Sequence, residues 1–129
     1  MRWPAIAGLT GVALLLTGCS LTTVSGGLEI EIVAGERADG SMYFEPAEVT
    51  VPVEAEVTFV VRNKGQADHE FESAEKGEAG IEEVLVPADR VRRVNWTAPS
   101  EPGVYPLYCD LPGHRAAGME ITLRVVEQP

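Results

Sequence analysis

Hydrophobic and polar residues alternate along most of this chain beyond Gly27. In LEIEIV (28–33), Leu28, Ile30 and Ile32 share one face while glutamates take the other, which is the period of a half-buried strand. Four further stretches of this kind follow: EVTVPV (48–53), EVTFVVRN (56–63), GVYPLYC (103–109) and MEITLRVVE (119–127). Each predicts a short strand.

Two segments depart from simple alternation. RVRRVNWTA (90–98) reads as a strand with an irregularity at Arg92–Arg93, because Val91 is out of step with Val94 and Trp96. SAEKGEAG (73–80) has room for one turn of helix, but its glycines favour a loop.

Turn-forming residues at 63–65, 87–89 and 99–103 separate the predicted strands, and no stretch has a convincing helical period. Seven or so short strands in about a hundred residues are typical of an all-β sandwich or small barrel. We find no internal repeat and no second domain.

The first residues have the features of an export signal. Arg2 precedes an apolar run over 5–16, too short for a spanning helix, and LTGC (16–19) resembles the lipobox of bacterial lipoproteins. We therefore expect a lipoprotein signal peptide at 1–18, a flexible tether at 19–27 lipidated on Cys19, and one domain at 28–129. The alternative is an ordinary signal peptide whose cysteine is incidental.

The formal net charge of −10 argues against nucleic acid and anionic lipid as partners. Between Asp68 and Glu83 seven acidic residues face the single base Lys76. The simplest interpretation is a solvated loop face; the alternative is a field that steers a basic protein partner.

Cysteine use points to a bound group. If Cys19 carries lipid, Cys109 is the one thiol left and has no disulfide partner within the chain. A free thiol outside the cytoplasm is open to oxidation unless something occupies it, which is a first indication of a metal.

The stretch YCDLPGHRAAGM (108–119) places Cys109, His114 and Met119 at equal intervals. Taken singly, a cysteine or methionine is usually a core residue, and His114 in a Pro-Gly loop could lie on the surface. Together, thiolate, imidazole and thioether suit copper, whereas zinc has little use for a thioether. Pro112–Gly113 and Gly118 would form the turns of a loop around one ion.

The chain's other histidine completes this set. His69, in NKGQADHEFES (63–73), shares a strand face with Phe71, so it is predicted to point inward, with Glu70 and Glu72 pointing the other way. A copper site of the electron-transfer type needs two histidines, one cysteine and a weak axial ligand.

The order His69, Cys109, His114, Met119 near the end of an all-β chain resembles the cupredoxin (blue copper) family, and the loop spacing is similar to that of rusticyanins and sulfocyanins. YFEP (43–46) and WTAPSEPGVYPLYC (96–109) also look like strands that frame sites in this family. The resemblance covers 28–127 and implies a Greek-key β-sandwich or barrel of about seven to eight strands with one type 1 copper ion. It implies His69, Cys109 and His114 as equatorial ligands and Met119 as the long axial one.

One position departs from the family pattern. Plastocyanins and azurins usually have asparagine after the first histidine, where it ties the ligand loops together and tunes the cysteine sulfur, and this chain has Glu70. The departure bears on the reduction potential and not on the ligand set.

Four protein ligands leave no open position for a substrate, so we expect a carrier of single electrons and not an enzyme. Too few histidines and cysteines remain for a copper nitrite reductase, a multicopper oxidase or a binuclear centre. The alternatives are an extracytoplasmic copper carrier or buffer and a copper-sensing binding module.

Two electron routes are predicted. One leaves through His114, which lies among the small or apolar residues Leu111, Pro112 and Ala117. The other leaves through Tyr108, which period two turns away from Cys109; its alternative role is a surface aromatic. We expect redox partners such as c-type cytochromes or an oxidase subunit, basic at the contact, with a monomeric protein held outside the cytoplasm by its lipid anchor alone.

Overall fold

The computed structural model describes residues 26–73 and 79–128. The predicted signal peptide, the lipidation of Cys19, most of the predicted tether and residues 74–78 of the predicted loop lie outside these residues. Within the described part of the chain, no helix is long and apolar enough to cross a membrane.

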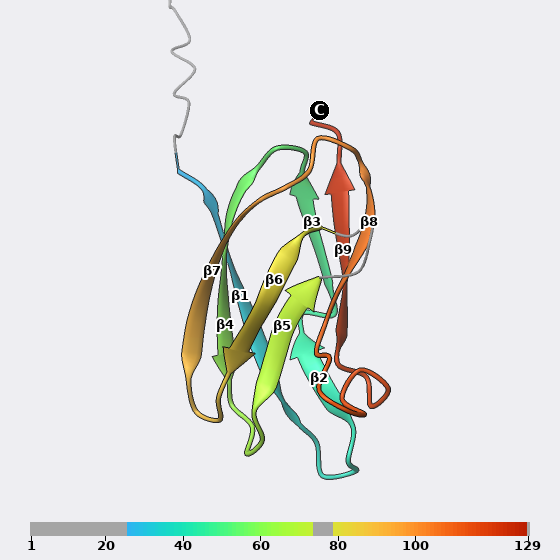
Figure 1. The fold of residues 1–129 in the computed structure, drawn as a ribbon. Coiled ribbons are helices and arrows are strands. Elements are labelled where there is room, and N and C mark those ends of the chain that lie inside the picture. The colour runs from blue at the N-terminus through green and yellow to red at the C-terminus, as the bar shows by residue number, and fades with distance from the viewer. Residues whose placement is uncertain (1–25, 74–78, 129) are drawn as a thin grey trace, which may run out of the picture.

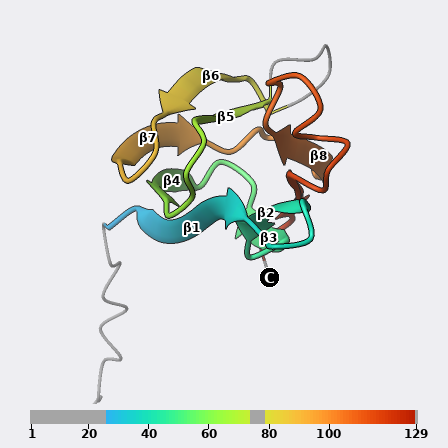
Figure 2. The same ribbon diagram turned by 90° about the horizontal axis from the view of Figure 1, so that it is seen from below.

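Within residues 26–73 and 79–128, nine strands form two packed sheets (Figures 1 and 2). The four-stranded sheet has the order β2-β1-β4-β7, and the five-stranded sheet has the order β3-β9-β8-β5-β6. The strands are β1 (Leu28–Glu36), β2 (Met42–Glu45), β3 (Glu48–Pro52), β4 (Glu56–Asn63), β5 (His69–Ser73), β6 (Ile81–Val86), β7 (Val91–Thr97), β8 (Gly103–Tyr108) and β9 (Glu120–Val126). The prediction of an all-β sandwich is confirmed.

The described residues contain nine strands and not the predicted seven to eight, because neither β2 nor β6 has a clear alternation. The two buried ends of β6, Ile81 and Val86, are five residues apart and so have opposite parity. The pairing of β5 with β6 shifts register between Phe71 and Ser73, which is how both ends come to face inward.

The irregularity expected at Arg92–Arg93 was wrong. β7 pairs with β4 without interruption from Glu56 opposite Thr97 to Arg62 opposite Val91. β7 is an edge strand, and its first residues are exposed on both faces, so neither Val91 nor Arg92 has to find a place in the core.

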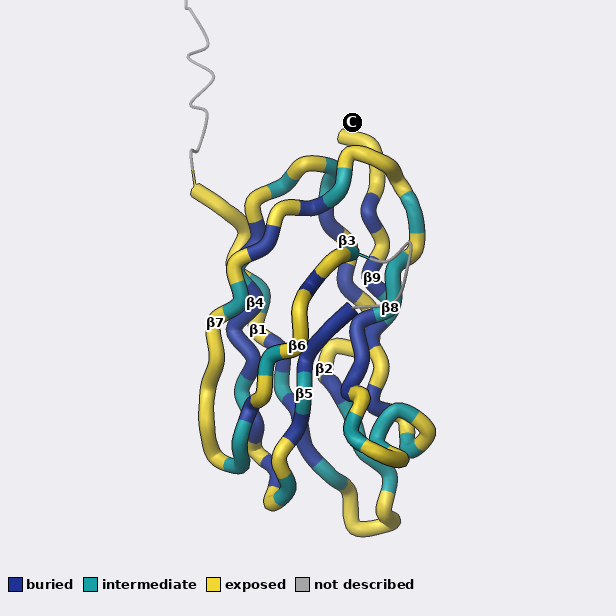
Figure 3. The backbone as a smooth tube through the Cα atoms, in the orientation of Figure 1, coloured by how far each residue is buried: buried dark blue, intermediate teal, exposed yellow. Residues whose placement is uncertain are grey.

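The core lies between the sheets. Along most strands, buried residues that face the core alternate with more exposed residues (Figure 3). Four aromatic rings connect the layers of the core: Phe71 lies 5.8 Å from Phe44 and 5.4 Å from Phe59, and Phe59 lies 5.7 Å from Trp96. Phe71 therefore fixes β5 in the core two residues after His69, as the shared-face prediction required.

Strand directions bring the candidate residues to one end of the sandwich. β1 and β4 run parallel and both end there, β8 also ends there, and β5 and β9 begin there (Figure 1). The start of β1 and the C-terminus lie at the opposite end (Figure 1).

Candidate metal centre

The segment between β8 and β9 is a compact loop held by its own backbone. Cys109 N donates to Met119 O (3.2 Å), and Met119 N donates to His114 O (3.2 Å), so the three predicted ligands of this loop are tied to one another. Gly113 and Gly118 have φ angles of 84° and 112°, which residues other than glycine rarely adopt. They form the predicted turns.

The segment between β4 and β5 is held from one side by Asn63, which is buried. Its side-chain nitrogen donates to Ala67 O (2.8 Å) and Val86 O (2.9 Å), and its side-chain oxygen accepts from Gly65 N (2.8 Å). Asn63 thus connects the end of β4 to the segment leading into His69 and to the neighbouring strand β6.

Glu36, the last residue of β1, holds the same segment from the other side. One carboxylate oxygen accepts from Gln66 N (2.9 Å) and the other from Ala67 N (3.0 Å). The latter oxygen also lies 2.9 Å from His69 Nε2, but at an angle outside that of a well-formed hydrogen bond. Burial alone would raise the pKa of Glu36, yet the N–H groups of Gln66 and Ala67 bring it below its usual value.

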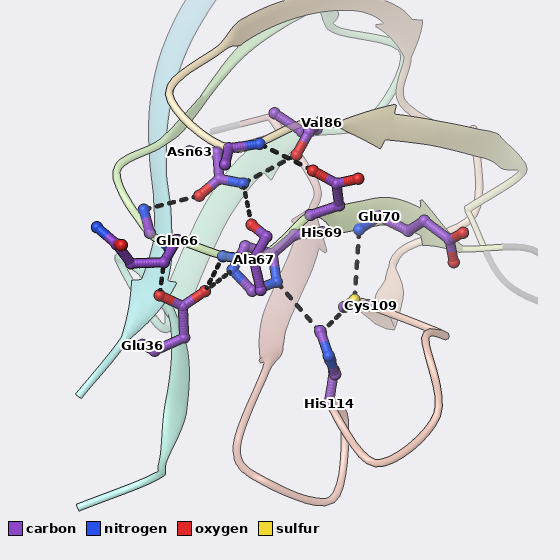
Figure 4. Close-up of polar contacts among 12 residues, drawn as sticks. Glu36, Asn63, Gln66, Ala67, His69, Glu70, Val86, Cys109 and His114 are labelled. Atoms are coloured by element: carbon purple, nitrogen blue, oxygen red, sulfur yellow. Dashed lines mark hydrogen bonds and ion pairs between the residues drawn. The ribbon is translucent and has the colours of Figure 1, made fainter. Parts of the chain in front are cut away.

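The donor atoms of His69, Cys109 and His114 converge, and all lie within 4.8 Å of one another (Figure 4). His69 Nδ1 is 3.2 Å from His114 Nδ1, which is 3.5 Å from Cys109 Sγ. An ion bound at roughly 2.0–2.3 Å from each donor would hold the donors about 3–4 Å apart. One thiolate and two imidazoles at these separations fit copper.

The backbone, not the side chain, of Glu70 contacts the cysteine sulfur. Glu70 N donates to Cys109 Sγ (3.3 Å) across the two ligand segments. Burial raises the pKa of the Cys109 thiol, and the N–H groups of Glu70 and Leu111 oppose that shift. This N–H contact to the sulfur is therefore present although position 70 is a glutamate and not the asparagine usual in plastocyanins and azurins.

His69, Cys109 and Met119 are fully buried, whereas His114 is half-buried. Burial lowers the pKa of His69, and the carboxylate of Glu36 partly opposes this. The backbone places Met119 beside Cys109 and His114, and its thioether as an axial ligand stays a prediction.

The surface around His114 is partly apolar. Leu111 and Ala117 are half-buried and Pro112 is exposed. Tyr108 does not open directly to solvent: its ring is 2% exposed, and the Arg115 guanidinium lies 3.9 Å from the ring centroid. Of the two residues predicted to lead electrons out, His114 is the more exposed.

Three carboxylates gather beside the same centre. Burial, and then Glu83 and Asp110, raise the pKa of Glu70. Glu83 and Asp110 are exposed, so negative charge borders the ligand segments on the surface.

Comparison with known proteins gives a consistent fold. A family model described as "Cupredoxin-like domain" matches residues 8–122. Among curated protein sequences, no significant match is found.

Several solved structures share the fold. Reduced auracyanin from Roseiflexus castenholzii is 23% identical, with a TM-score of 0.62 over 78% of this chain and 99% of that one. Auracyanin A from Chloroflexus aurantiacus, a "blue" copper protein, is 24% identical, with a TM-score of 0.60 over 78% of this chain and all (100%) of that one. A copper-containing nitrite reductase from Thermus scotoductus is 17% identical, with a TM-score of 0.65, but this chain spans only 31% of it.

Proposed function

The chain belongs to the cupredoxin-like family, and on that premise we propose that it is a blue copper protein that carries single electrons outside the cytoplasm. The observation that carries the proposal is the convergence of His69 Nδ1, His114 Nδ1 and Cys109 Sγ within 4.8 Å. Copper alternates between Cu(I) and Cu(II), which lets such a site take up and release one electron.

In the proposed site, His69, Cys109 and His114 bind the ion closely and Met119 caps it at longer range. Backbone hydrogen bonds between Cys109, His114 and Met119 hold one ligand segment, and the Glu70 N–H contact to Cys109 Sγ connects it to the other. Donors held in this way resist a change of geometry, which favours electron transfer over bond making with a substrate.

The half-buried His114 is the proposed exit for electrons. Its neighbours Leu111, Pro112 and Ala117 offer a small apolar contact surface, and Glu70, Glu83 and Asp110 border the centre. This combination supports a redox partner that is basic at the contact, such as a c-type cytochrome or an oxidase subunit.

We place the protein outside the cytoplasm, anchored through lipid on Cys19. The export-signal pattern at the start of the chain supports this location. The chain enters β1 at the end opposite the ligand segments, so a tether there would leave His114 facing away from the membrane (Figure 1).

A copper carrier or buffer is the second candidate. It must release the ion readily, and the full burial of His69 and Cys109 opposes that. The same fold also occurs in copper enzymes such as the nitrite reductase above, but this chain matches only 31% of that protein.

Stopped-flow mixing of the reduced copper protein with oxidised cytochrome c, beside a challenge with a Cu(I) chelator, separates the two candidates. The electron carrier should oxidise within the mixing experiment and keep its copper against the chelator. Rapid copper loss without electron transfer to any redox protein tested would support the carrier and refute our proposal.

A further inference from the structure

The contacts of Glu36 extend beyond those that fold the loop. Its carboxylate is the group closest to the far ring nitrogen of His69, at 2.9 Å, while the other ring nitrogen faces His114 and Cys109 (Figure 4). We propose that Glu36 is a positioning residue for His69, one that fixes its tautomer and sets the balance between Cu(I) and Cu(II) at the site. This inference rests on the proposed copper site.

The tautomer follows from which groups face the ring. A carboxylate 2.9 Å from Nε2 favours a proton on that nitrogen, because the positive N–H group then lies beside the negative charge even without a well-formed hydrogen bond. Nδ1 is then unprotonated, and its lone pair faces the convergence of His69, His114 and Cys109. A neutral imidazole bound to a metal through one nitrogen and held by a carboxylate through the other is a recurrent arrangement that orients the ring and makes it a better donor.

Two hydrogen bonds and the open position at Gly65 locate the carboxylate. Gln66 N and Ala67 N donate one hydrogen bond to each of its oxygens, so it cannot turn away without breaking both. Position 65 is kept clear for it: a Cβ on Gly65 would collide with both carboxylate oxygens. The residue on β1, the glycine and the two N–H groups therefore form one arrangement directed at His69.

The expected effect on the metal is electrostatic as well as geometric. A negative charge next to a ligand stabilises the ion of higher charge, so Glu36 should favour Cu(II) over Cu(I). Removal of a group that supports a ligand in this way typically weakens metal binding about 10–100-fold. If Cu(II) binding weakens tenfold more than Cu(I) binding, the reduction potential rises by about 59 mV.

Two variants test this by different means. Glu36→Gln keeps the size of the side chain and removes its charge, and Gly65→Ala leaves Glu36 intact but pushes its carboxylate off His69. The matched control is Glu31→Gln, which removes a carboxylate from the same strand, where it pairs with Arg62 on the surface. The reduction potential is measured by spectroelectrochemistry on each copper-loaded protein.

Both test variants should have a higher potential than the wild type, and Glu31→Gln should not. Equal potentials in Glu36→Gln and Glu31→Gln, with blue wild-type protein, would overturn the role of Glu36 and leave the proposed function standing. Colourless wild-type protein would instead refute the proposed function.

Nitrogen-15 NMR of the His69 ring without copper tests the tautomer separately. The wild type should hold its proton on Nε2, and Gly65→Ala should lose that preference. A wild-type ring protonated on Nδ1 would overturn the proposal whatever the copper results. Unchanged amide protection along β4, which pairs with β1, would show that Glu36→Gln kept its fold.

Discussion

Replacing Asn63 with alanine would remove the side chain that holds the β4–β5 segment. Asn63 is 2% exposed and makes three hydrogen bonds, to Ala67 O, Val86 O and Gly65 N, at 2.8–2.9 Å. The change leaves two carbonyl groups and one N–H group without this partner. Among the described residues, Asn63 is the one whose side chain hydrogen-bonds to all three of Ala67 O, Val86 O and Gly65 N.

Each lost hydrogen bond costs about 1 kcal/mol, so the variant should lose about 3 kcal/mol of unfolding free energy. Water that enters the space left by the amide would offset part of this. For a domain of about 100 residues, each kcal/mol lowers Tm by about 4–8 °C, so we expect Tm to fall by roughly 10–20 °C.

Urea unfolding of the copper-free protein, followed by the fluorescence of the buried Trp96, measures this loss. Asn95→Ala is the matched control, since Asn95 is exposed and accepts a single hydrogen bond from Thr58 Oγ1 (2.9 Å). The control should stay within about 0.5 kcal/mol of the wild type. A loss below about 1 kcal/mol in Asn63→Ala, or one equal to that of the control, would refute the role assigned to Asn63.

Three further outcomes are expected. A charge at the apolar surface, introduced as Leu111→Asp or Ala117→Asp, should slow electron exchange with a cytochrome in stopped-flow, because docking would bury an unpaired charge, and should leave the copper colour unchanged. The control is Val104→Asp, at an apolar residue on β8 that is 60% exposed. Equal electron-exchange rates in all three variants would refute His114 as the exit. Cys19→Ala should move the protein from the membrane to the soluble fraction with its copper site intact, and a mature N-terminus other than Cys19 in mass spectrometry would count against lipidation. Burial lowers the pKa of His69, so below about pH 6.5 the unfolded chain binds a proton that the folded chain does not bind. The unfolding free energy of the copper-free protein should therefore fall as the pH drops below about 6.5. The same fall in a His69→Gln variant would show that another group is responsible.

Alternation of residues was enough to predict most of the sheet. The edges of the strands at 28–33, 56–63 and 103–109 are close to those of β1, β4 and β8, because each has one face in the core. β6 has no such face along its whole length, and β2 buries only Phe44, so neither produced a period that could be recognised. The hydrophobic alternation also did not indicate which strands distant in sequence pair with one another.

The three converging donors could be predicted because soft ligands are scarce in this chain. His69 and Cys109 stood at the ends of predicted strands, and His114 stood in the loop that follows Cys109. Glu36 and Asn63 could not be predicted, because a glutamate or asparagine at a strand end looks like any other turn residue. Only the parallel pairing of β1 and β4, which places Ala34 opposite Asn63, brings their ends together beside His69. The contact between Glu70 and the cysteine sulfur could not be predicted from the residue type at this position, because the backbone N–H makes it.

The most direct test of the copper centre is a titration of the purified domain with Cu(II), followed by visible absorption. We predict an intense blue or green colour from thiolate charge transfer that saturates at one copper per chain. Cys109→Ser should abolish the colour. A wild-type protein that stays colourless, or that binds zinc in preference to copper, would contradict the assignment of His69, Cys109 and His114 as a blue copper site.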